Sequence, residues 1–202
     1  MLIGILGFIG SGKGTVGDIL AEHGFTKDSF AKPLKDSVSI VFGWQRDLLE
    51  GDTEQSRKWR EQPDAFWSEK FERPFTPREA LQLMGTEAGR DVFHNDIWVI
   101  SLLNRAKGKD VVVTDVRFKN EISYIQNNGG IVIRVKRGDD PSWFETLSEI
   151  ENNTEREVFM RSFGVHQSEW DWVGCPIDYN INNDGTINDL RQSVEKVLQF
   201  VR

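Results

Sequence analysis

Short apolar runs alternate with stretches of helical periodicity along this 202-residue chain. Residues 2–6, 110–114 and 131–135 are rich in Val, Ile and Leu, and they are too short to be anything but buried strands. Residues 24–28 and 179–181 are weaker strand candidates. The hydrophobic pattern therefore predicts five strands.

The stretches between these strands carry apolar residues at helical spacing. A capping box with proline at the first helical position, Thr76–Glu79, starts a helix expected to end near Gly85. Thr186 is the expected N-cap of the last helix. Helices are predicted over 16–22, 32–42, 76–85, 96–106, 120–127 and 186–201. Strands alternating with helices predict an α/β fold with a five-stranded parallel sheet flanked by helices.

Two segments do not fit this alternation. Residues 44–75 mix Trp and Phe with Arg, Lys and acids. Such a mixture can stack on nucleic acid, but a helical excursion whose aromatic side chains pack on the core is the simpler interpretation. Residues 137–168 are polar and charged with weak periodicity, which is typical of a lid over an active site. No linker separates these segments, so one domain is expected over 1–202.

Composition narrows the possible partners. The formal net charge is −7, which argues against binding to nucleic acid polymers. A single cysteine, Cys175, excludes an internal disulfide and fits a reducing cytoplasm. No apolar run approaches 18 residues, and the first residues lack the basic start of a signal peptide, so neither a membrane span nor a leader is expected.

The candidate chemistry begins directly after the first strand. The stretch from Gly7 to Thr15, GFIGSGKGT, has the context of a phosphate-binding loop, because a strand precedes it and a helix follows. Glycines let backbone N–H groups turn toward an anion, and the helix start adds partial positive charge. The residues expected to hold nucleotide phosphates are Gly10, Ser11, Gly12, Lys13, Gly14 and Thr15. Gly14 replaces the hydroxyl residue of the usual G-K-[S/T] ending, so Thr15 is the hydroxyl left for a metal ion.

A second candidate site follows the 110–114 strand. Asp115 is placed to organise Mg²⁺, and Arg117 is placed to bind a phosphate. An ion pair between Arg117 and Glu121 is the alternative for that arginine. Both side chains are expected near the phosphate loop, because ligands of parallel sheets collect at the carboxyl ends of the strands.

Further candidates lie in the two irregular regions and at the last turn. Arg137, Arg156 and Arg161 are the lid arginines that could stabilise a transferred phosphate. A capping or hinge role is favoured over a hydrolase triad for the 166–169 segment, HQSE, with Ser168 starting a short helix. Arg90, Asp96 and Trp98 offer a phosphate ligand, an acceptor and a stacking face. Asn182 and Gly185, in the loop before the last helix, can border an adenine, although a bare turn would look much the same.

Together these segments resemble the deoxynucleoside monophosphate kinases of tailed bacteriophages, within the P-loop kinase superfamily. The matching pieces are GFIGSGKGT (7–15), FAKPLK (30–35), LQLMGTE (81–87) with Arg90, DIW (96–98), TDVRFKNE (114–121), HQSE (166–169) and INNDGT (181–186). The phosphate loop alone is shared by many kinases, whereas D-V-R-F-x-N-E combined with H-x-S-E and N-D-G-T is far more specific.

The resemblance implies a P-loop fold with a helical monophosphate-binding subdomain, about 30–105, and a lid, about 137–168. It implies transfer of phosphate from ATP to a deoxynucleoside 5′-monophosphate with Mg²⁺, in a cytoplasm (that of the bacterial host if the chain is viral). Lys13 would hold the donor, and Thr15 and Asp115 the metal. Lys35, Arg90 and Arg117 would hold the acceptor phosphate, and Trp98 suits a base. A homodimer is possible, as family members are often dimers.

Two alternatives stay open. Animal phosphomevalonate kinases are distantly similar, so another small phosphorylated acceptor is the closest rival. A nucleotide-binding regulator that hydrolyses ATP slowly is the rival from a different class.

Overall fold

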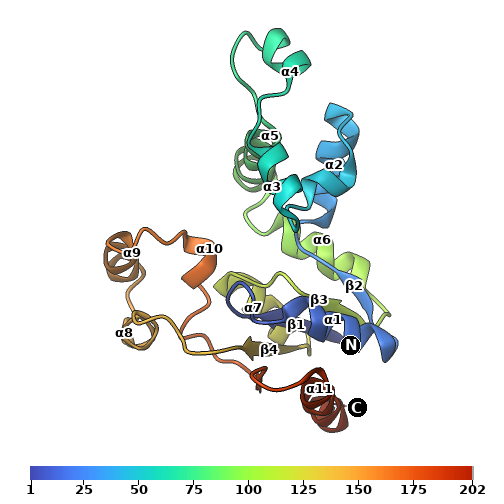
Figure 1. Ribbon diagram of the computed structural model, residues 1–202, viewed down its shortest axis with the longest axis vertical. Coiled ribbons are helices and arrows are strands. Elements are labelled where there is room, and N and C mark those ends of the chain that lie inside the picture. The colour runs from blue at the N-terminus through green and yellow to red at the C-terminus, as the bar shows by residue number, and fades with distance from the viewer. Residues whose placement is uncertain (202) are drawn as a thin grey trace. The chain divides into compact units, whose positions relative to one another are not determined.

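Five parallel strands form one sheet in the order β2-β3-β1-β4-β5, and β1, β2, β3 and β4 are labelled in Figure 1. The computed structural model describes residues 1–201. The strands are β1 (Leu2–Leu6), β2 (Thr26–Asp28), β3 (Val111–Val113), β4 (Ile131–Lys136) and β5 (Tyr179–Asn182). This is the P-loop topology expected from the sequence, with the phosphate loop leaving the central strand.

The register of the three central strands decides what meets at the carboxyl edge of the sheet. Gly4 in β1 lies opposite Val113 in β3 and Val132 in β4, and Leu6 lies opposite Arg134. Two residues beyond Val113, Asp115 is therefore level with the end of β1. The segments that follow β1, β3 and β4 consequently leave the sheet beside one another.

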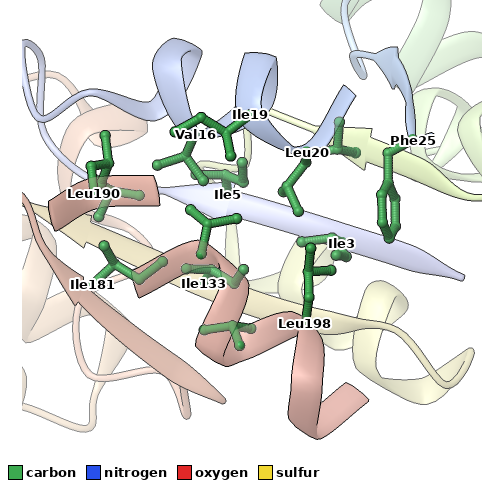
Figure 2. Close-up of a cluster of buried hydrophobic side chains, with 14 residues drawn as sticks. Ile3, Ile5, Val16, Ile19, Leu20, Phe25, Ile133, Ile181, Leu190 and Leu198 are labelled. Carbon is green, nitrogen blue, oxygen red and sulfur yellow. The ribbon is translucent and has the colours of Figure 1, made fainter. Parts of the chain in front are cut away.

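One face of the sheet is closed by two helices, α1 (Lys13–Glu22) and α11 (Ile187–Val201). Figure 2 shows the aliphatic core between these helices and the strands. Its members come from β1, β3, β4, β5, the turn before β2, α1 and α11: Ile3, Ile5, Val112, Ile133, Val135, Ile181, Phe25, Val16, Ile19, Leu20, Leu190, Val194, Val197 and Leu198. Burying one such side chain stabilises the fold by about 1.5–3 kcal/mol. This core therefore fixes the start of α1, and with it the loop that carries Lys13.

The helix α7 (Lys119–Asn127) contacts β1 and β4. At its start the Glu121 carboxylate accepts hydrogen bonds from the backbone N–H groups of Arg117 (2.7 Å) and Phe118 (3.0 Å). At the start of α11, Thr186 and Asp189 cap each other, which confirms Thr186 as the N-cap.

The chain separates into two compact units. The sheet unit comprises Met1–Ser29 with Ala106–Arg202, and the helical unit comprises Phe30–Arg105. The helical unit spans the residues assigned above to monophosphate binding, and that binding stays a prediction. So do the single domain and the lid.

The helical unit contains α2 (Lys32–Phe42), η1 (a 3₁₀ helix, Arg46–Leu49), α3 (Glu54–Arg60), α4 (Ala65–Lys70), α5 (Pro77–Gln82), η2 (a π-helix, Leu83–Phe93) and the start of α6 (Ile97–Ala106). Its core combines two buried rings, Trp44 and Phe75, with the buried side chains of Val38, Leu49 and Ala80. The Trp44 ring stacks on Phe42 with centroids 4.7 Å apart and meets Trp59 edge-on at 5.9 Å. The prediction that the aromatic side chains of 44–75 pack on the core holds for Trp44 and Phe75, whereas Phe66 and Phe71 are exposed.

The prediction that a helix ends near Gly85 is wrong. The chain continues from α5 into the π-helix η2, whose Gly85 and Gly89 are buried. The Trp98 indole N–H donates to the Gly85 carbonyl at 2.8 Å, and a Cβ on Gly89 would lie 2.7 Å from the Trp98 ring. These glycines are thus packing positions for Trp98 and do not terminate a helix.

The segment 137–168 is more ordered than its weak periodicity suggests. It contains α8 (Phe144–Glu149) and α9 (Asn153–Arg161), and it leads into α10 (Gln167–Trp170). Trp143, Leu147, Met160 and Trp170 are buried. The pattern was obscured because each helix is short and buries only one or two apolar side chains.

Candidate active site

The phosphate loop runs between β1 and α1 and depends on glycine geometry. Gly12, the residue before α1, has φ 100°, a left-handed value that favours glycine. A Cβ on Gly12 would lie 2.3 Å from Nδ2 of Asn183, so there is also no space for a side chain. The backbone N–H groups of Lys13, Gly14 and Thr15 form the first turn of α1, where N–H groups have no acceptor within the helix. The loop therefore offers donors to an anion, as the sequence predicts.

Gly10, Gly14 and Thr15 border open space in this loop. A Cβ on Gly10 or Gly14 would meet no atom within 4 Å, and Thr15 is exposed. Ser11, in contrast, is buried at 4% exposure, and its hydroxyl has no hydrogen-bond partner within the described chain. Because its side chain is buried, Ser11 is expected to contact phosphate only through its backbone N–H.

The Lys13 ammonium lies over its own loop. Its Nζ donates to the carbonyl oxygens of Gly7 at 2.7 Å and Phe8 at 2.9 Å. Burial lowers the pKa of Lys13, nearby Arg117 lowers it further, and Glu169 raises it in partial compensation. A half-buried cation on a loop that also offers free N–H donors can neutralise a bound polyphosphate.

The loop between β5 and α11 is hydrogen-bonded to the phosphate loop. The Asn183 side chain donates from Nδ2 to the Ser11 carbonyl at 2.8 Å, and its backbone N–H donates to the Lys136 carbonyl at 2.7 Å. Two residues proposed to border the adenine are exposed here: Asn182, the last residue of β5, and Gly185, in the loop. Sequence reasoning placed this loop near the nucleotide but missed the role of Asn183 as a tether.

Asp115 is the second residue after β3 and is half-buried. Together with Thr15 it offers one carboxylate and one hydroxyl at the carboxyl end of the sheet. Among the described residues no group of three or more His, Cys, Asp or Glu side chains could enclose a metal ion. One or two protein oxygens completed by water and phosphate oxygens suit Mg²⁺, which rarely has an all-protein cage.

Glu121 caps α7 by accepting from the Arg117 backbone N–H at 2.7 Å. The Arg117 guanidinium donates from Nη1 to Glu169 Oε1 at 2.7 Å and to Ser168 Oγ at 3.3 Å. These side chains share a small cavity with Lys13. Arg117 therefore reaches the phosphate loop, as predicted, and Glu169 is a partner that sequence reasoning missed.

The N-cap of α10 is His166 and not Ser168. The His166 Nδ1 accepts from the Ser168 backbone N–H at 3.2 Å and lies 3.0 Å from the Ser168 hydroxyl. Imidazole can cap a helix through its unprotonated nitrogen, a possibility that residue preferences for capping do not favour. The prediction that this segment caps a helix is therefore correct, but the capping residue is His166 where Ser168 was expected.

Aromatic rings connect the phosphate loop to the 137–173 segment. Phe8, inside the loop, contacts Trp172 at 5.1 Å, Trp143 at 5.6 Å and Phe144 at 6.0 Å between ring centroids. Arg134 of β4 lies over Phe144 at 4.4 Å. Ring packing therefore holds this segment against the phosphate loop. The loop residue that makes these contacts is Phe8, which lies between Gly7 and Gly10.

The three proposed lid arginines differ sharply in their surroundings. Arg137 and Arg161 are exposed, whereas Arg156 is 2% exposed. The Arg156 guanidinium donates to five backbone carbonyls: those of Leu147, Ile150, Trp170, Asp171 and Val173. Its Nη1 and Nη2 groups are used in holding α8, α9 and α10 together, so the expectation that Arg156 contacts a transferred phosphate finds no support. We assign it a structural role instead.

The acceptor candidates Lys35, Arg90, Asp96 and Trp98 belong to the helical unit. The Lys35 ammonium donates to the Glu50 carboxylate at 2.5 Å. Arg90 is half-buried in η2, and Asp96 comes directly before α6. Trp98 holds η2 through the contacts described above. Their roles toward a substrate stay predictions.

Comparison with known proteins identifies the family. No family model matches the chain. A protein of Acanthamoeba polyphaga mimivirus, described as "Putative deoxynucleotide monophosphate kinase", is 34% identical over 152 residues, covering 68% of this chain and 74% of that protein. The chain belongs to the deoxynucleoside monophosphate kinase family. The deoxynucleoside-5′-monophosphate kinase of Escherichia phage T5 is 28% identical over 177 residues, covering 60% of this chain and 70% of the phage protein.

Solved structures resemble the chain at low sequence identity. Dephospho-CoA kinase from Campylobacter jejuni has a TM-score of 0.46 at 18% identity, covering 99% of this chain and 96% of that one. Shikimate kinase from Bacteroides thetaiotaomicron has a TM-score of 0.46 at 16% identity, covering 100% of this chain and 98% of that one.

Within residues 1–201, none of the helices has the length and apolar character needed to cross a membrane.

Proposed function

We propose that this chain transfers the γ-phosphate of ATP to the 5′-phosphate of a deoxynucleoside monophosphate, yielding ADP and the diphosphate. The observation that carries the proposal is the phosphate loop, in which Gly12 at positive φ precedes the first turn of α1 and the Lys13 ammonium bonds to the Gly7 carbonyl of the same loop. Family membership supplies the acceptor class. The substrate is a free nucleotide, in keeping with the net charge of −7.

The donor phosphates are held by backbone N–H groups from Gly10 to Thr15 and by Lys13. Positioning and charge stabilisation account for most of the catalysis of phosphoryl transfer. In the reaction an acceptor phosphate oxygen bonds to the γ-phosphorus while the bond from that phosphorus to the β–γ bridging oxygen breaks. ADP leaves with the bonding electrons. Lys13 stabilises the negative charge spread over the transferring group.

Thr15 and Asp115 are the residues that would hold Mg²⁺, because both offer hard oxygen ligands at the carboxyl end of the sheet. When bound, the ion supplies further charge neutralisation at the β- and γ-phosphates. Thr15 lies one position after Gly14, which stands where the hydroxyl residue usually is. This shift favours contact between the Thr15 hydroxyl and the ion through a water molecule.

Arg117 is proposed to bind the acceptor phosphate, with Arg90 and Lys35 as further ligands and Asp96 and Trp98 at the base. Arg137 and Arg161 remain proposed lid arginines, because both are exposed and can reorient. Exclusion of water is necessary, since water would otherwise accept the γ-phosphate. The packing of Phe8 against Trp172 provides an apolar wall at one side of the loop.

The test is ADP release from Mg·ATP across a panel of acceptors. The panel contains dAMP, dCMP, dGMP, dTMP, hydroxymethyl-dCMP, the ribonucleotides and phosphomevalonate. We expect release that depends strictly on one or a few deoxynucleoside monophosphates. Release only with phosphomevalonate would reassign the acceptor, and release without any acceptor would indicate a nucleotide-hydrolysing regulator.

A further inference from the structure

Glu169 is an acidic residue that lines a small cavity together with Lys13 of the phosphate loop, which is proposed to bind anions. Its side chain is 26% exposed, and it extends from α10 so that Oε1 accepts from Arg117 Nη1 at 2.7 Å. A carboxylate repels phosphate, so its presence at this position requires an explanation beyond packing.

The position of the ion pair is well determined on both sides. The Arg117 backbone is held by Glu121, and the next turn is held by Asp171, whose Oδ2 accepts from the Lys119 N–H at 2.9 Å. On the other side the Glu169 backbone N–H donates to the His166 carbonyl at 3.0 Å. Since Asp171 is the C-cap residue of α10, this bond ties the segment after Arg117 to the helix that carries Glu169 and keeps the two charges together.

The cavity enclosed by this pair is too small for a phosphate. It is lined by Gly7, Lys13, Val116, Arg117, Ser168, Glu169 and Trp172, and its volume is about 10 Å³. This is room for about one water molecule. A phosphate group does not fit in this cavity while the Arg117–Glu169 pair is closed.

The charges in the cavity indicate what replaces the pair. Glu169 is the one carboxylate among these lining residues, and two cations, Lys13 and Arg117, accompany it. The carboxylate thus occupies a position that suits an anion, between groups that a nucleotide phosphate would also contact. Carboxylate and phosphate are both bound by guanidinium in the same forked geometry.

We propose that Glu169 is a positioning residue that holds the Arg117 guanidinium at the phosphate loop until a nucleotide phosphate displaces the carboxylate. Glu169 and the phosphate then compete for one cation. This inference rests on the proposed function, because it assumes that the loop binds polyphosphate. It assigns a role to the H-x-S-E segment, whose first residue caps α10 and whose last residue pairs with Arg117.

The experiment measures the affinity of inorganic triphosphate by calorimetry in the intact chain. Glu169→Gln keeps the shape of the side chain and removes its charge, so we expect triphosphate to bind about five-fold more tightly, the size of a partly exposed ion pair. Glu157→Gln, which removes an exposed acid on α9, is the matched control and should change the affinity by less than about 1.5-fold.

A double-mutant cycle with Arg117→Gln separates competition from a structural effect. If the carboxylate acts through Arg117, the gain from Glu169→Gln should shrink below about two-fold in the Arg117→Gln background. Unchanged or weaker binding in Glu169→Gln, with binding still dependent on Lys13, would overturn the competition and leave the proposed function standing. Absence of triphosphate binding in the unmodified chain would overturn both. Thermal melting of each variant identifies loss of folding. Glu169→Asp provides a second variant, because its shorter carboxylate should lose contact with Arg117, and it should also bind triphosphate more tightly.

Discussion

The two units of this kinase are built from different cores. In the sheet unit, aliphatic side chains from the strands and two helices form one cluster, in which Phe25 is the one buried aromatic residue and the partly buried Tyr179 packs against it. In the helical unit, Trp44 and Phe75 are buried with Val38, Leu49 and Ala80, and Phe42, Trp59 and Trp67 pack around them. Regular packing gives a rigid frame, whereas a few large rings concentrate stability in single side chains.

The difference matches what each unit contributes. The sheet unit fixes the phosphate loop, where small displacements would misplace Lys13 relative to the transferring group. The helical unit has short helices, none longer than 11 residues, which are marginal alone and depend on tertiary packing. Indole N–H groups strengthen that packing, since Trp44 donates to Asp64 at 2.9 Å and Trp67 to the Phe42 carbonyl at 3.0 Å.

The largest expected effect separates chemistry from stability in the sheet unit. Lys13→Ala should lower phosphoryl transfer at least about 1,000-fold, or about 4 kcal/mol, because the cation at the transferring phosphate is lost. Unfolding free energy should change by less than about 1.5 kcal/mol, since only hydrogen bonds to two loop carbonyls are removed. Steady-state kinetics and denaturant unfolding measure both, with Lys196→Ala on α11 as the control.

Turnover within about three-fold of the unmodified chain in Lys13→Ala would remove the phosphate loop from the mechanism.

The next effect concerns the helical unit alone. Trp44→Ala should destabilise by about 3–5 kcal/mol, because it removes a ring that contacts Phe42, Trp59 and Phe75 and deprives Asp64 of a donor. Hydrogen exchange should accelerate within residues 30–105 before it does so in the strands. Phe66→Ala, an aromatic truncation at a side chain that is 59% exposed, should cost less than about 1 kcal/mol. Equal losses in the two variants would show that the aromatic core does not concentrate stability as described.

A smaller effect returns to the chemistry. Asp115→Asn is nearly isosteric and should lower kcat about 100-fold, or about 2.7 kcal/mol, the typical size for one electrostatic element. Raising the Mg²⁺ concentration should recover part of the loss if the carboxylate holds the ion through water. Asp139→Asn, at an exposed acid after β4, serves as the control. An unchanged kcat would assign Asp115 a structural role.

The smallest effect tests the regular core. Ile133→Val removes one methyl group from a fully buried position and should cost about 1 kcal/mol, measured by urea unfolding. Because neighbouring aliphatic side chains share the packing, activity should remain within about two-fold. A loss above about 3 kcal/mol would show that stability in the sheet unit is as concentrated as in the helical unit.

The sheet and the phosphate loop could be predicted from the sequence because their constraints are local. Apolar runs of strand length, a glycine required at positive φ before α1 and the Thr186 cap are each determined by neighbouring residues. The burial of Trp44 and Phe75 was also predictable in kind, since a short stretch with so many rings favours packing of some of them in a core, although Phe66 and Phe71 are exposed.

Other features depend on segments that meet only in the folded chain. Arg156 looks like a mobile lid arginine in the sequence, but the free carbonyls that bind it come from the ends of α8 and α10. The extension of α5 into a π-helix depends on Trp98, which lies 13 residues from the carbonyl it binds. Glu169 lies 52 residues from Arg117, so no local pattern could pair them. Long-range polar contacts of this kind decide which charged residues face the substrate.

The most direct measurement of the central claim follows the phosphate itself. The chain is incubated with γ-labelled ATP, Mg²⁺ and one deoxynucleoside monophosphate, and the products are separated by chromatography. We predict that label appears on the deoxynucleoside diphosphate in amounts equal to the ADP formed, and that Lys13→Ala abolishes both products. Label found as inorganic phosphate, with or without the acceptor, would contradict the claim that this phosphate loop serves phosphoryl transfer to a nucleotide.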